Sequence, residues 1–296
     1  MTEAVEEILH VLNRDDIREY PRETIGQALQ YEKELTPHLI AILENLLSDH
    51  ESFRERKRYF GHNFAMNLLA HFGNQDAHEV IVKIMALPGD AVDHLFGDMI
   101  TEDFPRILYQ TCGGRYEKIR ELVLNKQADD FVRGSAMKAL VFGVLLDDLP
   151  RSETLDFFGG LFTGSESQDS THFWSGAASC VYRLYPEELM ATIQNAYERG
   201  LIWPGYIRME TFHEALSQDE SSFLQNMKQR LKLEIRDDFH GYMSWWACFD
   251  KDTSPSLGMG IDDIDYPQRP AGKKKRSKKK AEKRRAKASR RKNRRR

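Results

Sequence analysis

The sequence predicts an all-α protein: a HEAT-like α-solenoid of stacked helix pairs, followed by a disordered basic C-terminal tail. Three observations favour this fold. Apolar residues recur at helical spacing, strand signals are scarce, and similar helix pairs return at regular intervals. With 296 residues, of which 41% are hydrophobic, the chain is long enough to bury a sizeable core. We expect a helical repeat domain over residues 1–250, an acidic linker over 251–272 and a Lys/Arg-rich tail over 273–296.

The first clear helix is predicted to begin at Thr36 and to continue to Leu47. Thr36 is a suitable N-cap residue, and Pro37 suits the first helical position because its missing N–H would have no partner there. Apolar side chains then recur on one face, which another element must cover. Three further amphipathic helices are predicted over residues 60–72, 132–144 and 173–184.

Similar helix pairs recur along the chain. Ala65, Ala136 and Ala177 are each followed four residues later by a larger apolar residue, and they stand 71 and 41 residues apart. If the longer interval covers two repeats, the period is roughly 35–41 residues. Two-helix repeats of this length are typical of HEAT and tetratricopeptide solenoids, and an irregular helical domain is the alternative.

Residues 129–140, with the sequence DDFVRGSAMKAL, resemble the second helix of a HEAT repeat. Together with LLAHFG at 68–73 and GDMITE at 97–102, they are similar to the bacterial family known as domain of unknown function 1186. The resemblance spans residues 5–250. Members of that family often end in a SEC-C module, a short cysteine-rich zinc-binding motif. No cysteine follows Cys248 in this chain, so the resemblance implies no zinc site here.

The cysteines and the N-terminus favour a cytoplasmic location. Cys112, Cys180 and Cys248 are odd in number and far apart, so the sequence predicts neither a disulfide framework nor a Cys-x-x-Cys zinc site. The first residues are acidic where a secretory signal would be basic, and the longest apolar run, residues 139–146, is too short to span a bilayer. We therefore expect a soluble protein without membrane insertion.

Positive charge is concentrated at the C-terminus. Residues 273–296 contain 17 Lys/Arg and one acid, whereas residues 1–272 carry a net charge of −19. A segment of this composition builds no core, and without aromatic residues it does not stack on bases. We expect it to bind polyanions without sequence readout, with RNA or the ribosome favoured over DNA. The candidate nucleic-acid-binding residues are Lys273, Lys274, Lys275, Arg276, Lys278, Lys279, Lys280, Lys283, Arg284, Arg285, Lys287, Arg290, Arg291, Lys292, Arg294, Arg295 and Arg296.

His94, Asp98 and Glu102 form a candidate metal-binding set. Their spacing of i, i+4 and i+8 would line one helix face with ligands suited to a divalent ion, as in a metal-dependent enzyme. In the alternative, Asp98 caps a helix and Glu102 lies near its positive N-terminus. No nucleotide-binding or nucleophile motif occurs in the sequence, so we expect neither catalysis nor a cofactor.

Aromatic residues gather near the end of the repeat domain. Trp203, Tyr242, Trp245 and Trp246 predict either the terminal cap of the stack or a groove for a protein partner. The favoured function is a non-catalytic binding or scaffold protein whose tail binds nucleic acid. A purely structural, self-associating module is the other alternative.

Overall fold

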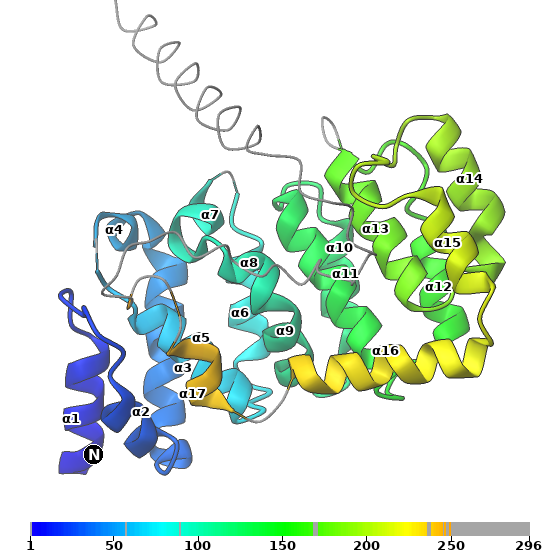
Figure 1. Cartoon of the computed structure of the whole chain (residues 1–296). Helices are drawn as coiled ribbons and strands as arrows, with labels where there is room; N and C mark the ends of the chain where they lie inside the picture. The colour runs from blue at the N-terminus through cyan, green and yellow to red at the C-terminus, as the bar shows by residue number, and fades with distance from the viewer. Residues whose placement is uncertain are drawn as a thin grey trace, which may run out of the picture. The chain divides into compact units, whose positions relative to one another are not determined.

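Helical spacing in the sequence is matched by helices throughout the computed structural model, which describes residues 2–56, 58–88, 90–167, 171–235, 238–244, 246 and 249 (Figure 1). These residues lie in one compact unit and form α-helices and one 3-10 helix, without a strand. None of the helices described is both long and apolar enough to cross a membrane. In chain order the elements are α1 (Glu3–Leu12), α2 (Arg22–Ala28), α3 (Glu32–Ser48), α4 (His50–Glu55), α5 (Gly61–His71), α6 (His78–Met85), α7 (Ala91–Phe96), α8 (Met99–Glu102), α9 (Phe104–Cys112), α10 (Tyr116–Leu124), α11 (Asp130–Leu145), α12 (Arg151–Gly159), α13 (Thr171–Arg183), η1 (Glu187–Leu189), α14 (Met190–Glu198), α15 (Met209–Leu216), α16 (Glu220–Glu234) and α17 (Phe239–Met243).

The first predicted helix forms, but its predicted start is wrong. α3 begins at Glu32, so Pro37 lies inside the helix. Acidic residues in the first turn favour the earlier start because they complement the helix dipole, and Thr36 Oγ1 donates to the Glu32 carbonyl at 2.9 Å. The apolar face that the sequence predicts is buried and consists of Leu35, Leu39, Ile42, Leu43 and Leu46.

The other three predicted helices are confirmed to within two residues as α5, α11 and α13. α5 ends just before Gly73, which adopts the left-handed φ of +61° that a helix C-terminus favours. After Pro186 the chain forms the 3-10 turn η1 before α14 begins. For these segments, the capping residues, the apolar spacing and the helix-ending glycine or proline are therefore sufficient to predict the helix bounds.

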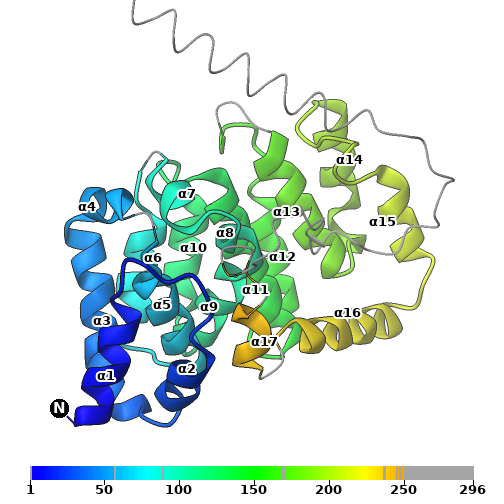
Figure 2. The same cartoon turned by 60° about the vertical axis from the view of Figure 1, so that its left-hand side comes forward.

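The helices pack in chain order as two rows. The first row consists of α3, α5, α9, α11, α13 and α15, and each of these helices except the last contacts the one that follows it. In the second row, α6 contacts α3, α9 and α10, while α10 and α12 contact α11 (Figures 1 and 2). Neighbouring helices of the two rows thus cover one another's apolar faces. That these helix pairs are repeats of a HEAT-like solenoid stays a prediction.

Several hydrogen bonds between successive helices join residues at similar sequence separations. Bonds at a separation of 33 residues join His62 to Leu95, His78 to Thr111, Arg133 to Glu166, Arg151 to Leu184 and Tyr185 to Gln218. Other bonds join residues 35 to 40 positions apart. The repeat period of roughly 35–41 residues stays a prediction.

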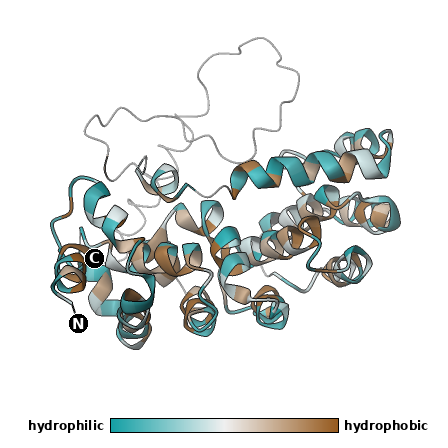
Figure 3. Cartoon of the chain, turned by 90° about the horizontal axis from the view of Figure 1, so that it is seen from below, coloured by the Kyte–Doolittle hydropathy of each residue, from teal (hydrophilic) through white to brown (hydrophobic). Residues whose placement is uncertain are grey.

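The C-terminal strap, which we define as α16, α17, Trp246 and Phe249, departs from this order. α16 is mainly hydrophilic and buries one narrow stripe, Phe223, Met227 and Leu231 (Figure 3). It contacts α11, and α17 then lies beside the N-terminal half of the array (Figures 1 and 2). The strap therefore carries the chain back from its last repeats toward its first helices.

The Tyr20 hydroxyl fixes the far end of the strap. It lies 2.8 Å from His240 Nδ1, although the two residues are 220 positions apart. His71 meets Phe239 with ring centroids 5.4 Å apart. These contacts join α17 to the loop before α2 and to the end of α5, so they span a far longer stretch of chain than any contact between neighbouring pairs.

Arg133 joins two neighbouring helix pairs from a fully buried position. Its Nε donates to the Val123 carbonyl at 2.8 Å, and its Nη1 donates to the Glu166 carbonyl at 2.7 Å and to Asp130 Oδ1 at 2.9 Å. The guanidinium also lies over the ring of Phe173, with its Cζ 4.0 Å from the ring centroid. One side chain thus satisfies buried acceptors from two pairs.

Replacing Arg133 with methionine should destabilise the domain strongly. Arg133→Met leaves two backbone carbonyls and the Asp130 carboxylate without their buried donor, and breaking such a pair costs about 3 kcal/mol or more. Urea unfolding followed by circular dichroism measures this loss. The control is Lys118→Met, which removes an exposed Lys118–Glu121 pair and should change the unfolding midpoint little. Equal midpoints for the two variants would contradict the role of Arg133.

Two buried histidines are held neutral. His62 and His78 are 3% and 2% exposed, and burial lowers the pKa of each to about 4. His62 Nε2 lies 3.1 Å from the Leu95 carbonyl, and His78 Nδ1 lies 2.9 Å from Thr111 Oγ1. Their second ring nitrogens are buried without a partner among the described residues, so protonation of either ring would place an uncompensated charge in the core.

The folded protein should therefore lose stability as the pH falls from about 6.5 toward 4. In that window the unfolded chain binds protons at both histidines and the folded chain does not, so each contributes a slope of about 1.4 kcal/mol per pH unit. Urea midpoints between about pH 7.5 and 5 measure the slope. His62→Asn with His78→Asn should flatten it, whereas the exposed His10→Gln should not. Equal slopes for both variants would refute the assignment.

Candidate functional site

The basic tail lies outside the described residues. The nucleic-acid-binding role of its candidate residues, from Lys273 to Arg296, therefore remains a prediction from the sequence. The same holds for Trp245 in the aromatic group. What the structure describes is the domain that bears the tail and the remaining candidate residues.

His94, Asp98 and Glu102 do not share one helix face. α7 ends at Phe96, and Gly97 turns the chain with a left-handed φ of +50° before α8 begins. His94 Nε2 instead lies 3.0 Å from the Arg54 carbonyl. The predicted single helix is therefore wrong, because the glycine interrupts it.

Nor does the surrounding chemistry mark a metal site. Across the described ranges, no group of three or more His, Cys, Asp or Glu side chains has an arrangement that could hold a metal ion. Asp98 precedes α8 but its side chain makes no capping bond. Burial raises the pKa of Glu102, and the negative charges of Asp103 and Asp98 raise it further. Glu102 is thus a partly desolvated carboxyl beside other acids.

The candidate aromatic groove divides into two separate places. Trp203 lies in the loop between α14 and α15, 48% exposed, and its backbone N–H donates to Ser175 Oγ at 2.9 Å. Tyr242 and Trp246 belong to the C-terminal strap, on the other side of the array (Figures 1 and 2). Trp246 stacks on Phe249 with ring centroids 6.2 Å apart. These residues therefore do not line one common groove.

Tyr242 covers a buried polar cluster on α5 and α9. The Arg106 guanidinium, 4% exposed as a residue, lies under the tyrosine ring with its Cζ 4.3 Å from the ring centroid. It donates to Asp103 Oδ1 at 3.3 Å, to Gln110 Oε1 at 2.8 Å and to the Asn67 side-chain oxygen. Burial raises the pKa of Asp103, and the charge of Arg106 opposes that rise. Tyr242 thus covers an ion pair at the start of α9 that is also bonded to Asn67 of α5.

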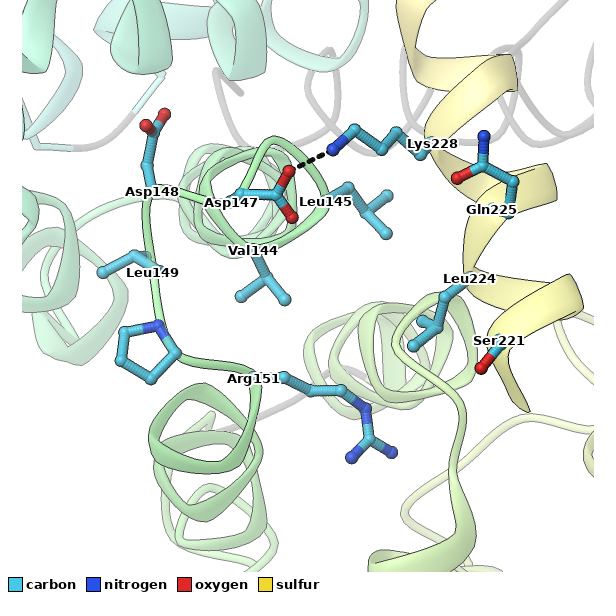
Figure 4. Close-up of a pocket in the computed structure, with 11 residues that line it drawn as sticks. Val144, Leu145, Asp147, Asp148, Leu149, Arg151, Ser221, Leu224, Gln225 and Lys228 are labelled. Atoms are coloured by element: carbon cyan, nitrogen blue, oxygen red, sulfur yellow. Dashed lines mark hydrogen bonds and ion pairs between the residues drawn. The ribbon is translucent and has the colours of Figure 1, made fainter.

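A cavity of about 670 Å³ opens between the α11–α12 turn and α16 (Figure 4). Its volume falls in the range of small-molecule sites. Charged side chains from the turn and from the strap stand at its edge, and no sequence pattern pointed to it because its two walls come from distant segments. Its apolar lining consists of Val144, Leu145, Leu149, Pro150 and Leu224.

The carboxylates of this cavity are engaged in structural contacts. Asp147, which adopts a left-handed φ of +69°, pairs with Lys228 of α16 (Figure 4). Asp148 Oδ2 accepts from the Tyr109 hydroxyl at 2.7 Å and from the Tyr116 hydroxyl at 3.4 Å. Burial raises the pKa of both tyrosines, so their hydroxyls remain protonated donors.

The arginine of the cavity is engaged as well. Arg151 donates to the Leu184 carbonyl at 2.6 Å and to the Tyr185 carbonyl at 2.7 Å, and it forms an ion pair with Glu188. The charged groups around the cavity therefore form contacts that join the α11–α12 turn to α16 and to the chain after α13. Among the residues that line the cavity, no nucleophile is paired with a base.

Comparison with known proteins places this architecture in a family. The family described as "Protein of unknown function (DUF1186)" matches residues 3–250. An uncharacterised protein of Chlamydia muridarum (strain MoPn / Nigg) is 31% identical over 231 residues, which cover 77% of this chain and 92% of that protein. An uncharacterised protein of Chlamydia trachomatis serovar D is 31% identical over 221 residues, covering 75% and 87%. No solved structure gives a significant match. From α1 to the end of the strap, the chain belongs to the DUF1186 family of proteins of unknown function.

Proposed function

We propose that this chain is a non-catalytic nucleic-acid-binding protein in which the basic tail binds RNA and the helical domain carries the tail. The observation that carries the proposal is charge segregation. Residues 273–296 hold 17 of the 43 Lys/Arg residues, and the preceding 272 residues have a net charge of −19. The tail therefore supplies the attraction for phosphate, and the domain as a whole repels it.

RNA is favoured over DNA by the chemistry of the tail. Its last seven residues, RRKNRRR, contain five arginines, whose planar guanidinium groups bind phosphates in a bidentate way. Arginine-rich segments fold on binding structured RNA, whereas sequence readout of DNA depends on base-edge contacts that this tail lacks a scaffold to make. The expected binding is strong at low salt and indifferent to sequence.

The contacts of the domain support a binding role more than a catalytic one. At the cavity beside α16, Asp147, Asp148 and Arg151 each hold a structural partner. The buried His62 and His78 serve in contacts between repeats. These five side chains thus act in structural contacts between helices.

Neutralising the tail should abolish binding to RNA. The intact chain should bind a fluorescent RNA hairpin, and log K should fall with log salt at a slope of about −7 to −9 if ten phosphates are neutralised. Replacing the Lys/Arg residues of 273–296 with glutamine should weaken binding at least a hundredfold at low salt. Fluorescence anisotropy over about 50 to 300 mM KCl measures both quantities.

Two results would contradict this function. Unchanged affinity after neutralisation of the tail would remove the tail from the interaction, and a salt-independent affinity would remove phosphate as the ligand. Duplex DNA and anionic vesicles of phosphatidylserine and phosphatidylcholine serve as competitors. Tighter binding to either one than to RNA would replace RNA as the partner.

A further inference from the structure

The strap fixes the point at which the chain leaves the described domain. Phe249 is 7% exposed, and its ring contacts those of Tyr20, Phe60 and Phe64, with centroids 5.8, 5.4 and 6.2 Å away. Residues 250–272 follow directly, and 23 residues span at most about 80 Å when extended. The chain therefore leaves the described domain beside the loop before α2 and the loop before α5, far in sequence from the helices that precede the strap.

In and next to these two loops lie exposed arginines for which the described residues offer no carboxylate partner. Arg18 and Arg22 lie next to Tyr20 in the sequence, and Arg58 lies two residues before Phe60. All three are exposed, and among the described residues none has a carboxylate oxygen within 4.0 Å. Acids outnumber basic residues in this domain, yet these three arginines near Phe249 form no ion pair with the described carboxylates. A structural ion pair therefore does not explain their position.

Two acids of the first loop, Asp15 and Asp16, form ion pairs with arginines. Asp15 Oδ1 accepts from Arg56 Nε at 2.6 Å, and Asp16 Oδ1 accepts from Arg14 Nε at 2.8 Å. These pairs reduce the local repulsion that a phosphate would meet. Within the second loop, Arg56 stacks over Tyr59 with its Cζ 3.5 Å from the ring centroid, and the Tyr59 hydroxyl donates to Asn13 Oδ1 at 3.0 Å, so the two loops are held together.

Arg22 begins α2, which packs against the end of the strap. A Cβ added at Gly26, four residues further along the same helix, would lie 3.8 Å from His240 Nε2. Burial lowers the pKa of His240, the positive charge of Arg22 lowers it further, and the negative charge of Asp238 opposes the shift. A phosphate near this turn of α2 would meet the exposed Arg22 guanidinium.

We propose that Arg18, Arg22 and Arg58 form a phosphate-binding patch at the point where the chain leaves the domain, and that RNA bound by the tail continues onto this patch. The inference rests on the proposed function and extends it, because it names a second contact on the folded domain. The patch and the tail then act as two linked binding elements, in which tethering raises the effective concentration of one for the other. Guanidinium groups suit this role because they bind phosphate through paired donors.

The experiment compares two triple variants of the full-length chain. Arg18→Gln, Arg22→Gln and Arg58→Gln together should weaken binding of the RNA hairpin about tenfold at 0.1 M KCl and should make the salt slope shallower by about 2 to 3. The control removes the same number of charges elsewhere, through Lys118→Gln, Arg230→Gln and Lys232→Gln. It should leave the slope unchanged. Because all of these side chains are exposed, thermal unfolding should confirm that both variants fold.

The outcomes separate the patch from the tail. If neutralising the tail abolishes binding while the two triple variants give equal slopes, the patch is refuted and the tail's role stands. If neutralising the tail has no effect, the proposed function is refuted. In that case a shallower slope for the patch variant alone would still assign phosphate contacts to Arg18, Arg22 and Arg58.

Discussion

The contact between one helix pair and the next is the constraint on which this protein depends. A single pair exposes an apolar face that water disfavours, so stability arises only when neighbouring pairs stack. Side chains complete each contact by donating to backbone carbonyls of the adjacent pair, as Arg133 does to Glu166 and Arg199 does to Phe162. Arginine suits this task because one planar group can satisfy several acceptors at once.

This constraint also explains why much of the domain's chemistry is structural. A guanidinium or imidazole buried between pairs must find partners there, since an unpaired polar group in the core is costly. Arg106 accordingly donates hydrogen bonds to Asp103, Asn67 and Gln110, and the ring of Tyr242 covers its guanidinium. The strap thereby covers the face of α5 and α9, whereas elsewhere a buried face is covered by the neighbouring helices.

Sequence periodicity predicts which face of a helix is buried, but it does not predict which other element packs against that face. α5, α11 and α13 are predictable to within two residues because their stripes, caps and breakers are local. α3 begins earlier than predicted, because acids in its first turn outweigh the N-cap signal of Thr36. The break at Gly97 follows from a left-handed backbone conformation, which the spacing of His94, Asp98 and Glu102 does not encode.

The strap lies beyond such local signals. Tyr20 and His240 are in contact although they are 220 residues apart, and no sequence pattern around either residue indicates the other as its partner. The aromatic residues of the C-terminal region are therefore recognisable from the sequence, but their separation into Trp203 on one loop and Tyr242 on the strap is not. The cavity beside α16 has the same origin, since its walls come from the α11–α12 turn and from a helix 81 residues away at the Asp147–Lys228 pair.

Charge and topology together determine where a polyanion could settle on this protein. The net charge of −19 over residues 1–272 makes most of the domain unfavourable for phosphate, whereas the 17 Lys/Arg residues of 273–296 favour it. The strap ends at Phe249, beside loops whose Asp15 and Asp16 are paired with Arg56 and Arg14. Charge attraction alone has no preferred orientation, so a complex of fixed geometry would need contacts from the folded domain. Near Phe249, Arg18, Arg22 and Arg58 are exposed and have no carboxylate oxygen within 4.0 Å among the described residues.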